Sequence, residues 1–153
     1  MKEKINIKVK QIKKDFEWEF DSPVYATDGS AGLDLFAALK DEIVLKPGEI
    51  KSIPTGIAFH IRDKSVAGFV FPRSGLSSKN GVTLVNSVGV IDSDYTGEII
   101  CPMINLSRDA YAIKPKDRIA QIVFIPIYLA NLFFCDDLES TKRGSGGFGS
   151  TGR

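Results

Sequence analysis

Apolar and polar residues alternate along much of the chain with the period of a β-strand. At residues 5–10, Ile, Ile and Val alternate with Asn, Lys and Lys, which is the pattern of a half-buried strand. Further short apolar runs follow between turn residues; they are Ile43–Leu45, Ile57–Ile61, Ala67–Phe71, Val82–Asn86, Glu98–Leu106 and Ile119–Leu129. Many short strands at this spacing are typical of a sandwich or barrel. The pattern therefore predicts an all-β domain.

Three features interrupt the strand pattern. Ser74 can cap one short helix that runs to Lys79 and that Asn80-Gly81 can end. Pro102 and Pro126 lie inside strand-like runs, and because proline lacks the N–H of a ladder bond we expect them at edges or bulges. The C-terminus is rich in glycine, so we divide the chain into a β-barrel domain, 1–142, and a flexible arm, 143–153.

Composition and charge narrow the class of protein. The chain has 153 residues, 43% hydrophobic and 25% charged, which suits one soluble domain. Its formal net charge of +1 gives no global field for nucleic acid or an anionic membrane, so we expect neither as a partner. The N-terminus is charged, and no window is apolar for the roughly 18 residues of a membrane span. We therefore expect a cytoplasmic location.

Few residues are available for metal or nucleophilic chemistry through sulfur or imidazole. The two cysteines, Cys101 and Cys135, are too few and too far apart in sequence for a disulfide framework or a zinc site. His60 is the one histidine, which excludes a histidine cluster within one chain. It lies in a strand-like run, so a structural role is favoured over a Ser-His-Asp arrangement.

Two segments in the first half of the chain could bind an anion or a metal-bound water. Asp34 lies between two leucines, where a carboxylate costs free energy unless it is hydrogen-bonded or paired with a cation. A satisfied turn carboxylate is the simpler interpretation. Arg73 and Ser74 place a cation and a hydroxyl at the start of the possible helix, where free N–H groups favour phosphate. An ordinary helix cap is the alternative.

A third segment places a carboxylate at the mouth of a predicted hairpin. Asp94-Tyr95-Thr96-Gly97 fits a type I turn, with Asp first and Gly fourth. Asp92 then ends the incoming strand, where its carboxylate can accept a proton from water. Taken alone, a solvated turn carboxylate is the commoner case.

The last two segments lie in the C-terminal part of the chain. Arg118 and Gln121 are polar residues at the start of an apolar run, and alone they could be a charged turn and an edge-strand amide. A disordered terminus is the simplest interpretation of the glycine-rich tail. Its arginine and hydroxyl side chains can nevertheless bind phosphate, and Phe148 could stack on a base. A tail that orders on ligand binding would explain all of these residues.

Taken in order, the five segments resemble the five motifs of the trimeric deoxyuridine triphosphatase (dUTPase) family. They read Ala-Gly-Leu-Asp-Leu, Pro-Arg-Ser-Gly-Leu, Gly-Val-Ile-Asp-Ser-Asp-Tyr-Thr-Gly, Asp-Arg-Ile-Ala-Gln and Arg-Gly-Ser-Gly-Gly-Phe-Gly-Ser-Thr-Gly. The resemblance runs from about Ala26 to Gly152. It implies a jelly-roll-like β-barrel, assembled as a homotrimer with active sites shared between subunits. It also implies hydrolysis of dUTP to dUMP and pyrophosphate with Mg²⁺, which keeps uracil out of DNA and supplies dUMP for thymidylate synthesis.

The resemblance also implies a role for each matching residue. Asp92 would be the general base that activates the water attacking the α-phosphorus. Tyr95 would pack under the deoxyribose, and Asp34 would reach waters on the metal. The other substrate-binding positions are Arg73, Ser74, Gly75, Gln121, Arg143, Ser150 and Thr151 for the phosphates, and Asn86, Val90, Ile91, Ile100 and Phe148 for uracil, with Gly149 in the same arm.

Two other functions remain as alternatives. A dCTP deaminase shares the trimeric β-fold, but that family typically carries Asp-Pro-Gly-Trp or Tyr at the hairpin turn and a catalytic Glu in the next strand. Here the turn reads Asp92-Ser93-Asp94-Tyr95, and Pro102 falls where that Glu is expected, so deamination is disfavoured. A non-enzymatic module on the same scaffold is the second alternative, which fold alone does not distinguish. The intact Asp92 and the complete tail count against it.

Overall fold

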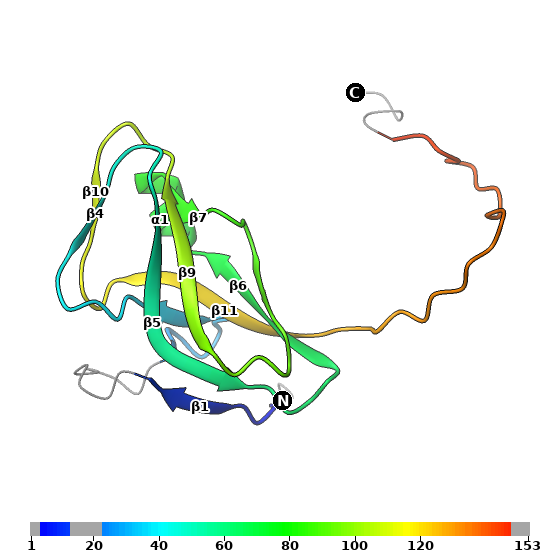
Figure 1. Ribbon diagram of the computed structural model, residues 1–153, viewed down its shortest axis with the longest axis horizontal. Coiled ribbons are helices and arrows are strands. Elements are labelled where there is room, and N and C mark those ends of the chain that lie inside the picture. Colours follow the sequence, from blue (N-terminus) through cyan, green and yellow to red (C-terminus); the bar gives the residue numbers. More distant parts are fainter. Residues whose placement is uncertain (1–3, 13–22, 148–153) are drawn as a thin grey trace.

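The computed structural model describes residues 4–12 and 23–147 (Figure 1). These residues form short strands and one short helix: β1 Lys8–Gln11, β2 Val24–Tyr25, β3 Leu33–Phe36, β4 Ile43–Leu45, β5 Ile50–His60, β6 Val66–Pro72, α1 Ser74–Asn80, β7 Val82–Leu84, β8 Gly89–Ile91, β9 Glu98–Asn105, β10 Tyr111–Ile113 and β11 Arg118–Pro126. In these ranges no helix has the length and apolar character that a membrane span requires.

The strands form two main antiparallel sheets with the core between them. One sheet has the order β1-β5-β9-β7 and the other the order β2-β3-β11-β6-β8, while β10 and β4 form a separate pair. Alternate side chains of both sheets point into one core, whose fully buried members include Leu35, Phe59, Met103 and Ile122. Burying each such side chain contributes about 1.5–3 kcal/mol. The all-β, jelly-roll-like fold with one short helix is confirmed.

The chain changes sheet twice around β8, and this creates the hairpin that carries Asp92. β7 pairs with β9 in the first sheet, β8 pairs with β6 in the second, and β9 returns to the first. A hydrogen bond from Tyr95 N to Asp92 O, 3.1 Å long, closes the turn between β8 and β9. The turn predicted over residues 94–97 is therefore wrong by two positions. Asp92 also satisfies the preference for Asp at the first turn position, so the sequence rule fits both registers.

Helix α1 ends as predicted but begins differently. Gly81 follows it in the left-handed conformation, with φ of 65°, and donates its N–H to Ser77 O. Glycine adopts this backbone readily because it has no Cβ. Ser74 is not the N-cap, since it lies inside the first turn. Arg73 takes the cap position with an extended backbone and makes no side-chain cap hydrogen bond.

Pro102 lies in β9 just beyond the last residue that pairs with β7, so the strand has an open edge at this position, as the prediction expects. It pairs with Ser52 of β5, and its carbonyl oxygen accepts a hydrogen bond from Val85 N, 2.9 Å away, just beyond the end of β7. The N and O of one strand residue point to the same side. The proline nitrogen therefore faces the place where β7 has already ended at Leu84, and no ladder bond is lost. Pro126 is the last residue of β11.

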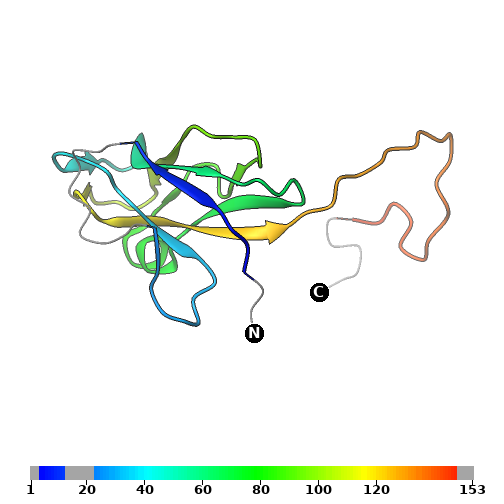
Figure 2. The same ribbon diagram turned by 90° about the horizontal axis from the view of Figure 1, so that it is seen from below.

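Beyond β11 the chain leaves the barrel. Figures 1 and 2 show residues 127–147 running away from the two sheets without regular secondary structure. From residue 128 on, the large apolar side chains of this segment are at least 75% exposed; they are Tyr128, Leu129, Leu132, Phe133, Phe134 and Leu138. Such a concentration of exposed apolar surface marks an interaction site.

Candidate active site

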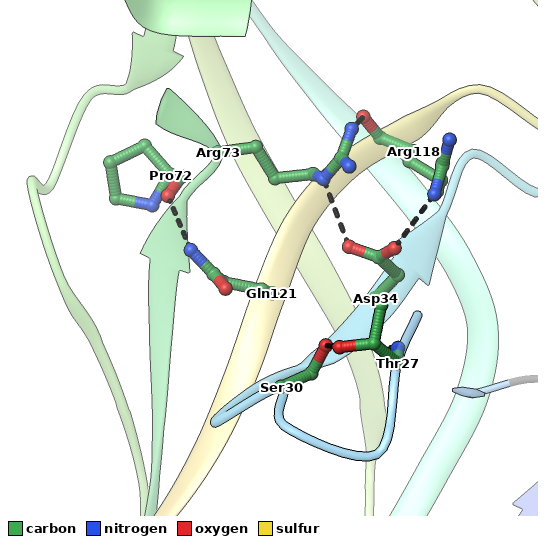
Figure 3. Close-up of polar contacts among 7 residues, drawn as sticks. All are labelled: Thr27, Ser30, Asp34, Pro72, Arg73, Arg118 and Gln121. Carbon is green, nitrogen blue, oxygen red and sulfur yellow. Dashed lines mark hydrogen bonds and ion pairs between the residues drawn. The ribbon is translucent and has the colours of Figure 1, made fainter. Parts of the chain in front are cut away.

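A buried carboxylate on β3 holds two arginines, one at the start of α1 and one at the start of β11 (Figure 3). Asp34 is only 5% exposed. Its Oδ1 lies 2.9 Å from Arg73 Nε, and its Oδ2 lies 3.2 Å from Arg118 Nη1. The pairing with cations meets the condition that burial of a carboxylate imposes. Two positive charges against one negative charge leave this cluster with a net charge of +1, which favours an anionic ligand.

Strand register brings these residues together from distant parts of the sequence. Asp34 of β3 is opposite Gln121 of β11, and Gln121 is in turn opposite Phe71 of β6. Arg73 follows β6 directly, and its Nη1 donates to Arg118 O at 3.4 Å. Three of the five motifs named above therefore meet at one end of the five-stranded sheet.

Gln121 lies beside this cluster with its amide fixed. Its Nε2 donates to Pro72 O at 3.2 Å (Figure 3). Gly32 leaves the room for this side chain, because a Cβ at residue 32 would lie 2.8 Å from Gln121 Oε1. The predicted phosphate residues Arg73 and Gln121 are thus close to Asp34, and Ser74 and Gly75 follow at the start of α1.

Arg118 is part of the cluster but was not among the predicted binding residues. In a regular strand, residues 118 and 121 would point to opposite faces, because side chains alternate with a period of two. A register shift between Arg118 and Ala120 in the β3–β11 pair breaks this alternation, as a bulge does. Arg118 and Gln121 thereby reach the same face as Asp34. A charged residue opening an apolar strand is the one sequence signal that points to it.

A cavity of about 290 Å³ opens beside the cluster, between α1 and the start of β11; it is lined by Arg73, Gly75, Leu76, Asn80, Tyr111, Ile113, Asp117, Arg118 and Ile119. Both arginines border it, and the rest of the lining mixes apolar side chains with the polar residues Asn80, Tyr111 and Asp117. Burial, together with the nearby charge of Asp117, raises the pKa of Tyr111 above its usual value, so its hydroxyl stays protonated at neutral pH. The cavity can thus take a group that is anionic at one end.

The hairpin at the far end of β8 carries the predicted base and the predicted sugar-binding tyrosine. Asp92 is exposed, and the Tyr95 side chain is 44% exposed. Tyr95 Oη donates to Glu98 O at 2.9 Å, which ties the ring to the first residue of β9. Asn86 is exposed in the loop before β8, where Val88 N donates to Asn86 O at 2.6 Å across Ser87.

The main chain of β9 opens toward this hairpin. The carbonyl oxygens of Glu98 and Pro102 accept hydrogen bonds from Tyr95 and Val85, both on the side of β9 that faces away from β5. Main-chain groups alternate in direction along a strand. The N–H and C=O of Ile100, which lies midway between these two residues, therefore face the same side.

β8 and the first half of β9 each leave an open main-chain edge beside this hairpin, and these two open edges are called the slot below. β8 is the edge strand of its sheet, paired only with β6, and β7 reaches β9 only at Met103–Asn105. Among the described residues no strand fills the gap between β8 and the first half of β9. Val90 and Ile100, 59% and 51% exposed, border this slot. The side chain of Ile91 packs against the core instead.

The slot and the arginine cluster lie far apart in one chain. Ile91 is opposite Gly68 in the β6–β8 pair, which places Asp92 level with Ala67. Arg73 follows six residues later along the direction of β6. At about 3.3 Å per residue, the two positions are roughly 20 Å apart.

In the described part of the arm, residues 143–147, Arg143 bonds within the arm itself. Arg143 Nε donates to Gly146 O at 2.8 Å, a contact inside its own turn. The predicted residues Phe148, Gly149, Ser150 and Thr151 lie outside the described residues.

The fold and these two clusters define a class: an all-β protein with a cationic cluster that suits an anion and, at a separate hairpin, an exposed carboxylate beside two open strand edges. A sequence model of the dUTPase family matches residues 19–152. The chain belongs to the dUTPase family.

Similar proteins of known name agree with this assignment. The chain is 48% identical over 148 residues to the deoxyuridine 5'-triphosphate nucleotidohydrolase of Desulfitobacterium hafniense strain DCB-2, covering 97% of both chains. It is 46% identical to the Shigella flexneri protein of the same name, over all of this chain and 99% of the other. A solved dUTPase of Staphylococcus bacteriophage 80alpha with dUpNHpp aligns with a TM-score of 0.79 and 27% identity, over 97% of this chain and 99% of that one.

Proposed function

We propose that the protein hydrolyses dUTP to dUMP and pyrophosphate, thereby keeping uracil out of DNA and supplying dUMP for thymidylate synthesis. The observation that carries this proposal is the slot between β8 and β9 with Asp92 at its mouth. The family assignment names the substrate, and the slot offers a place for its base next to a carboxylate.

The base would be recognised by main-chain groups. Ile100 presents one N–H donor and one C=O acceptor toward the slot, on the side of β9 that faces away from β5. Uracil carries alternating C=O and N–H groups along one edge, so it can pair with both. Cytosine reverses part of this pattern, and mispaired buried polar groups discriminate strongly. Asn86, at the other side of β8, would add an amide contact.

Asp92 would act as the general base. Its carboxylate is exposed at the turn, where it can accept a proton from the water that attacks the α-phosphorus. A positioned base contributes roughly 10²–10⁴-fold to the rate. The single histidine, His60, is exposed at the end of β5 and pairs with Lys8 of β1, which leaves Asp92 as the base beside the slot.

The arginine cluster would bind the phosphates. Each guanidinium has five N–H donors in a planar fork, so Arg73 and Arg118 keep donors free beyond those that hold Asp34. Ser74, Gly75 and Gln121 lie on the same side of the cluster, and Arg143, Ser150 and Thr151 would join them from the arm.

The residues near Asp34 fit a metal ion that binds together with the triphosphate. Within the described ranges, no group of three His, Cys, Asp or Glu side chains could hold a metal. Mg²⁺ commonly binds through substrate phosphates and keeps several waters. Asp34 would then accept hydrogen bonds from such waters. When bound, Mg²⁺ would offset the negative charge of the phosphates.

The two halves of the site would meet in a homotrimer. Phosphorus atoms in a triphosphate are separated by single bridging oxygens, so one substrate cannot reach across roughly 20 Å between Asp92 and Arg73. The hairpin of one chain would therefore face the arginine cluster of a second. Two surfaces support association with further copies: the exposed apolar arm, and the stacked rings of Phe69 and Phe71, 6.5 Å apart on the outer face of the five-stranded sheet.

A substrate panel tests the proposal. Pyrophosphate release is measured with dUTP, dTTP, dCTP and UTP, with and without Mg²⁺, together with ammonia release from dCTP. We expect turnover of dUTP alone, dependent on Mg²⁺. Release of ammonia from dCTP would instead identify a deaminase.

Two variants test the assigned parts. Asp92→Asn should abolish hydrolysis while dUTP still binds, and near-normal turnover would show that Asp92 is not the base. Deletion of residues 143–153 should cripple turnover without changing the oligomeric mass, about three times the 16.8 kDa of one chain. Full activity after the deletion would contradict a role for the arm.

A further inference from the structure

Gly97 is required neither by the closure of the hairpin turn nor by its own backbone conformation. The hydrogen-bonded turn spans Asp92–Tyr95, so residue 97 does not close it. Its φ does not lie in the left-handed region, unlike that of Gly48, Gly56, Gly81 and Gly144. An L-residue could therefore adopt the same backbone without strain. The reason for a glycine must lie in the space around it.

That space is filled by the ring of Tyr95. A Cβ on residue 97 would lie 2.6 Å from Tyr95 Oη, 2.7 Å from Cζ and 3.1 Å from Cε2. Ordinary van der Waals contact begins near 3.4 Å, so the ring would have to move by roughly 0.8 Å at its hydroxyl end. The phenol thus lies directly against the bare backbone of Gly97.

The position of the ring is also tied to the barrel. Tyr95 Oη donates to Glu98 O at 2.9 Å. The Glu98 carboxylate in turn accepts a hydrogen bond from Gly56 N of β5, 2.8 Å from Oε1, and Glu98 pairs with Ala58 in the same strand. A shift of the phenol by roughly 0.8 Å would stretch its hydrogen bond beyond the usual range.

We propose that Gly97 sets the sugar specificity of the enzyme, by leaving the space in which the Tyr95 ring is held against Glu98 as a fixed wall under the deoxyribose. The inference rests on the proposed function, because it assigns Gly97 to the site that would bind dUTP. Gly97 is a positioning residue, since it acts through Tyr95. An apolar wall that rejects one added hydroxyl discriminates by about 10²-fold, and a displaced wall loses part of this factor.

The test compares dUTP with UTP, which differ only in the 2′-hydroxyl. Values of kcat and KM for both nucleotides are measured in the wild type, Gly97→Ala, Tyr95→Phe and the double variant. Gly29→Ala is the matched control: residue 29 is exposed in a loop, has no left-handed φ, and a Cβ there meets only Thr27 Oγ1, at 3.9 Å. Thermal unfolding of each variant reports whether the fold is kept.

Gly97→Ala should lower the preference for dUTP over UTP, expressed as the ratio of kcat/KM values, by about tenfold, while the control keeps it. Tyr95→Phe should lower the same ratio, because it removes the contact with Glu98 without adding an atom. The loss of preference in the double variant should not exceed the larger of the two single losses, because both changes act on one ring.

Three results would overturn the inference. The first is an unchanged ratio of kcat/KM values for dUTP and UTP in either single variant that keeps normal dUTP turnover. The second is an equal loss of activity toward both nucleotides. The third is a double variant in which the effects of the two single changes simply multiply. Absence of dUTP hydrolysis by the wild type would overturn the proposed function, and this inference with it.

Discussion

Two inactive chains should restore each other's activity if the site is shared between subunits. Asp92→Asn removes the proposed base but leaves the arginine cluster intact. Arg73→Gln removes one cation of that cluster but leaves the hairpin intact. An assembly that contains both variants can therefore hold a site with the hairpin of one chain and the cluster of the other, both unaltered.

The structure fixes the size of the expected effect. If one substrate contacts both Asp92 and Arg73, their separation of roughly 20 Å in one chain requires each site to combine two chains. In a ring of three identical subunits, a random equal mixture makes about one site in four fully intact. Trimers purified to contain both variants hold one intact junction each, so about one third of the wild-type activity should return.

Co-expression with two different affinity tags and successive purification on each provides the mixed assemblies. Pyrophosphate release from dUTP is then compared with that of each variant alone and of doubly tagged wild type. Mass spectrometry verifies that both chains are present. If verified mixed assemblies were as inactive as the single variants, the hairpin and the cluster would serve the same substrate within one chain, and the reasoning from the separation along β6 would be refuted.

Three further predictions concern single residues. Thr55→Val should lower the free energy of unfolding by about 1–3 kcal/mol in urea denaturation, since it removes the buried 2.6 Å bond to Ile99 O; a loss below the error of the measurement would contradict this. Asp34→Asn should lower the free energy of unfolding by about 1–3 kcal/mol. This is less than the loss expected for a fully buried ion pair, because the side chains of the two arginines are 29% and 49% accessible. An unchanged urea midpoint would show that the ion pairs contribute no stability. Burial raises the pKa of the Cys101 thiol to about 12, whereas Cys135 is exposed, so a thiol reagent at pH 8 should modify one cysteine in the folded protein and both in denaturant.

The strand pattern of the sequence is sufficient for the fold class. The apolar runs at 43–45, 67–71 and 98–106 correspond closely to β4, β6 and β9, because short apolar runs bounded by turn residues are typical of buried strands. The pairing order is not predictable in this way. Antiparallel neighbours such as β3 and β11 are separated by most of the chain, and the local pattern contains no information on which distant strand lies alongside.

A local sequence rule can select the wrong residue where two positions satisfy it equally well. Asp at the first turn position fits both Asp92 and Asp94, and main-chain hydrogen bonding selects the former. Arg118 was not assigned a binding role from the sequence. Strand alternation alone would place it on the opposite face from Gln121, and the bulge brings both to one face. In both places the tertiary structure decides between alternatives of similar local free energy.

The separation between the arginine cluster and the Asp92 hairpin also explains why each motif is ambiguous by itself. Asp34 and Arg73 are brought together by strands that pair across the sheet, while Asp92 lies at the opposite end of β6. The Asp34 carboxylate is already paired with arginines, and the Asp92 carboxylate is exposed to solvent. Neither therefore needs a ligand to be stable. Only the requirement that one nucleotide contact both gives them a common function. If one nucleotide contacts both, the length of β6 makes this function depend on the contact between subunits and not on the fold of a single chain.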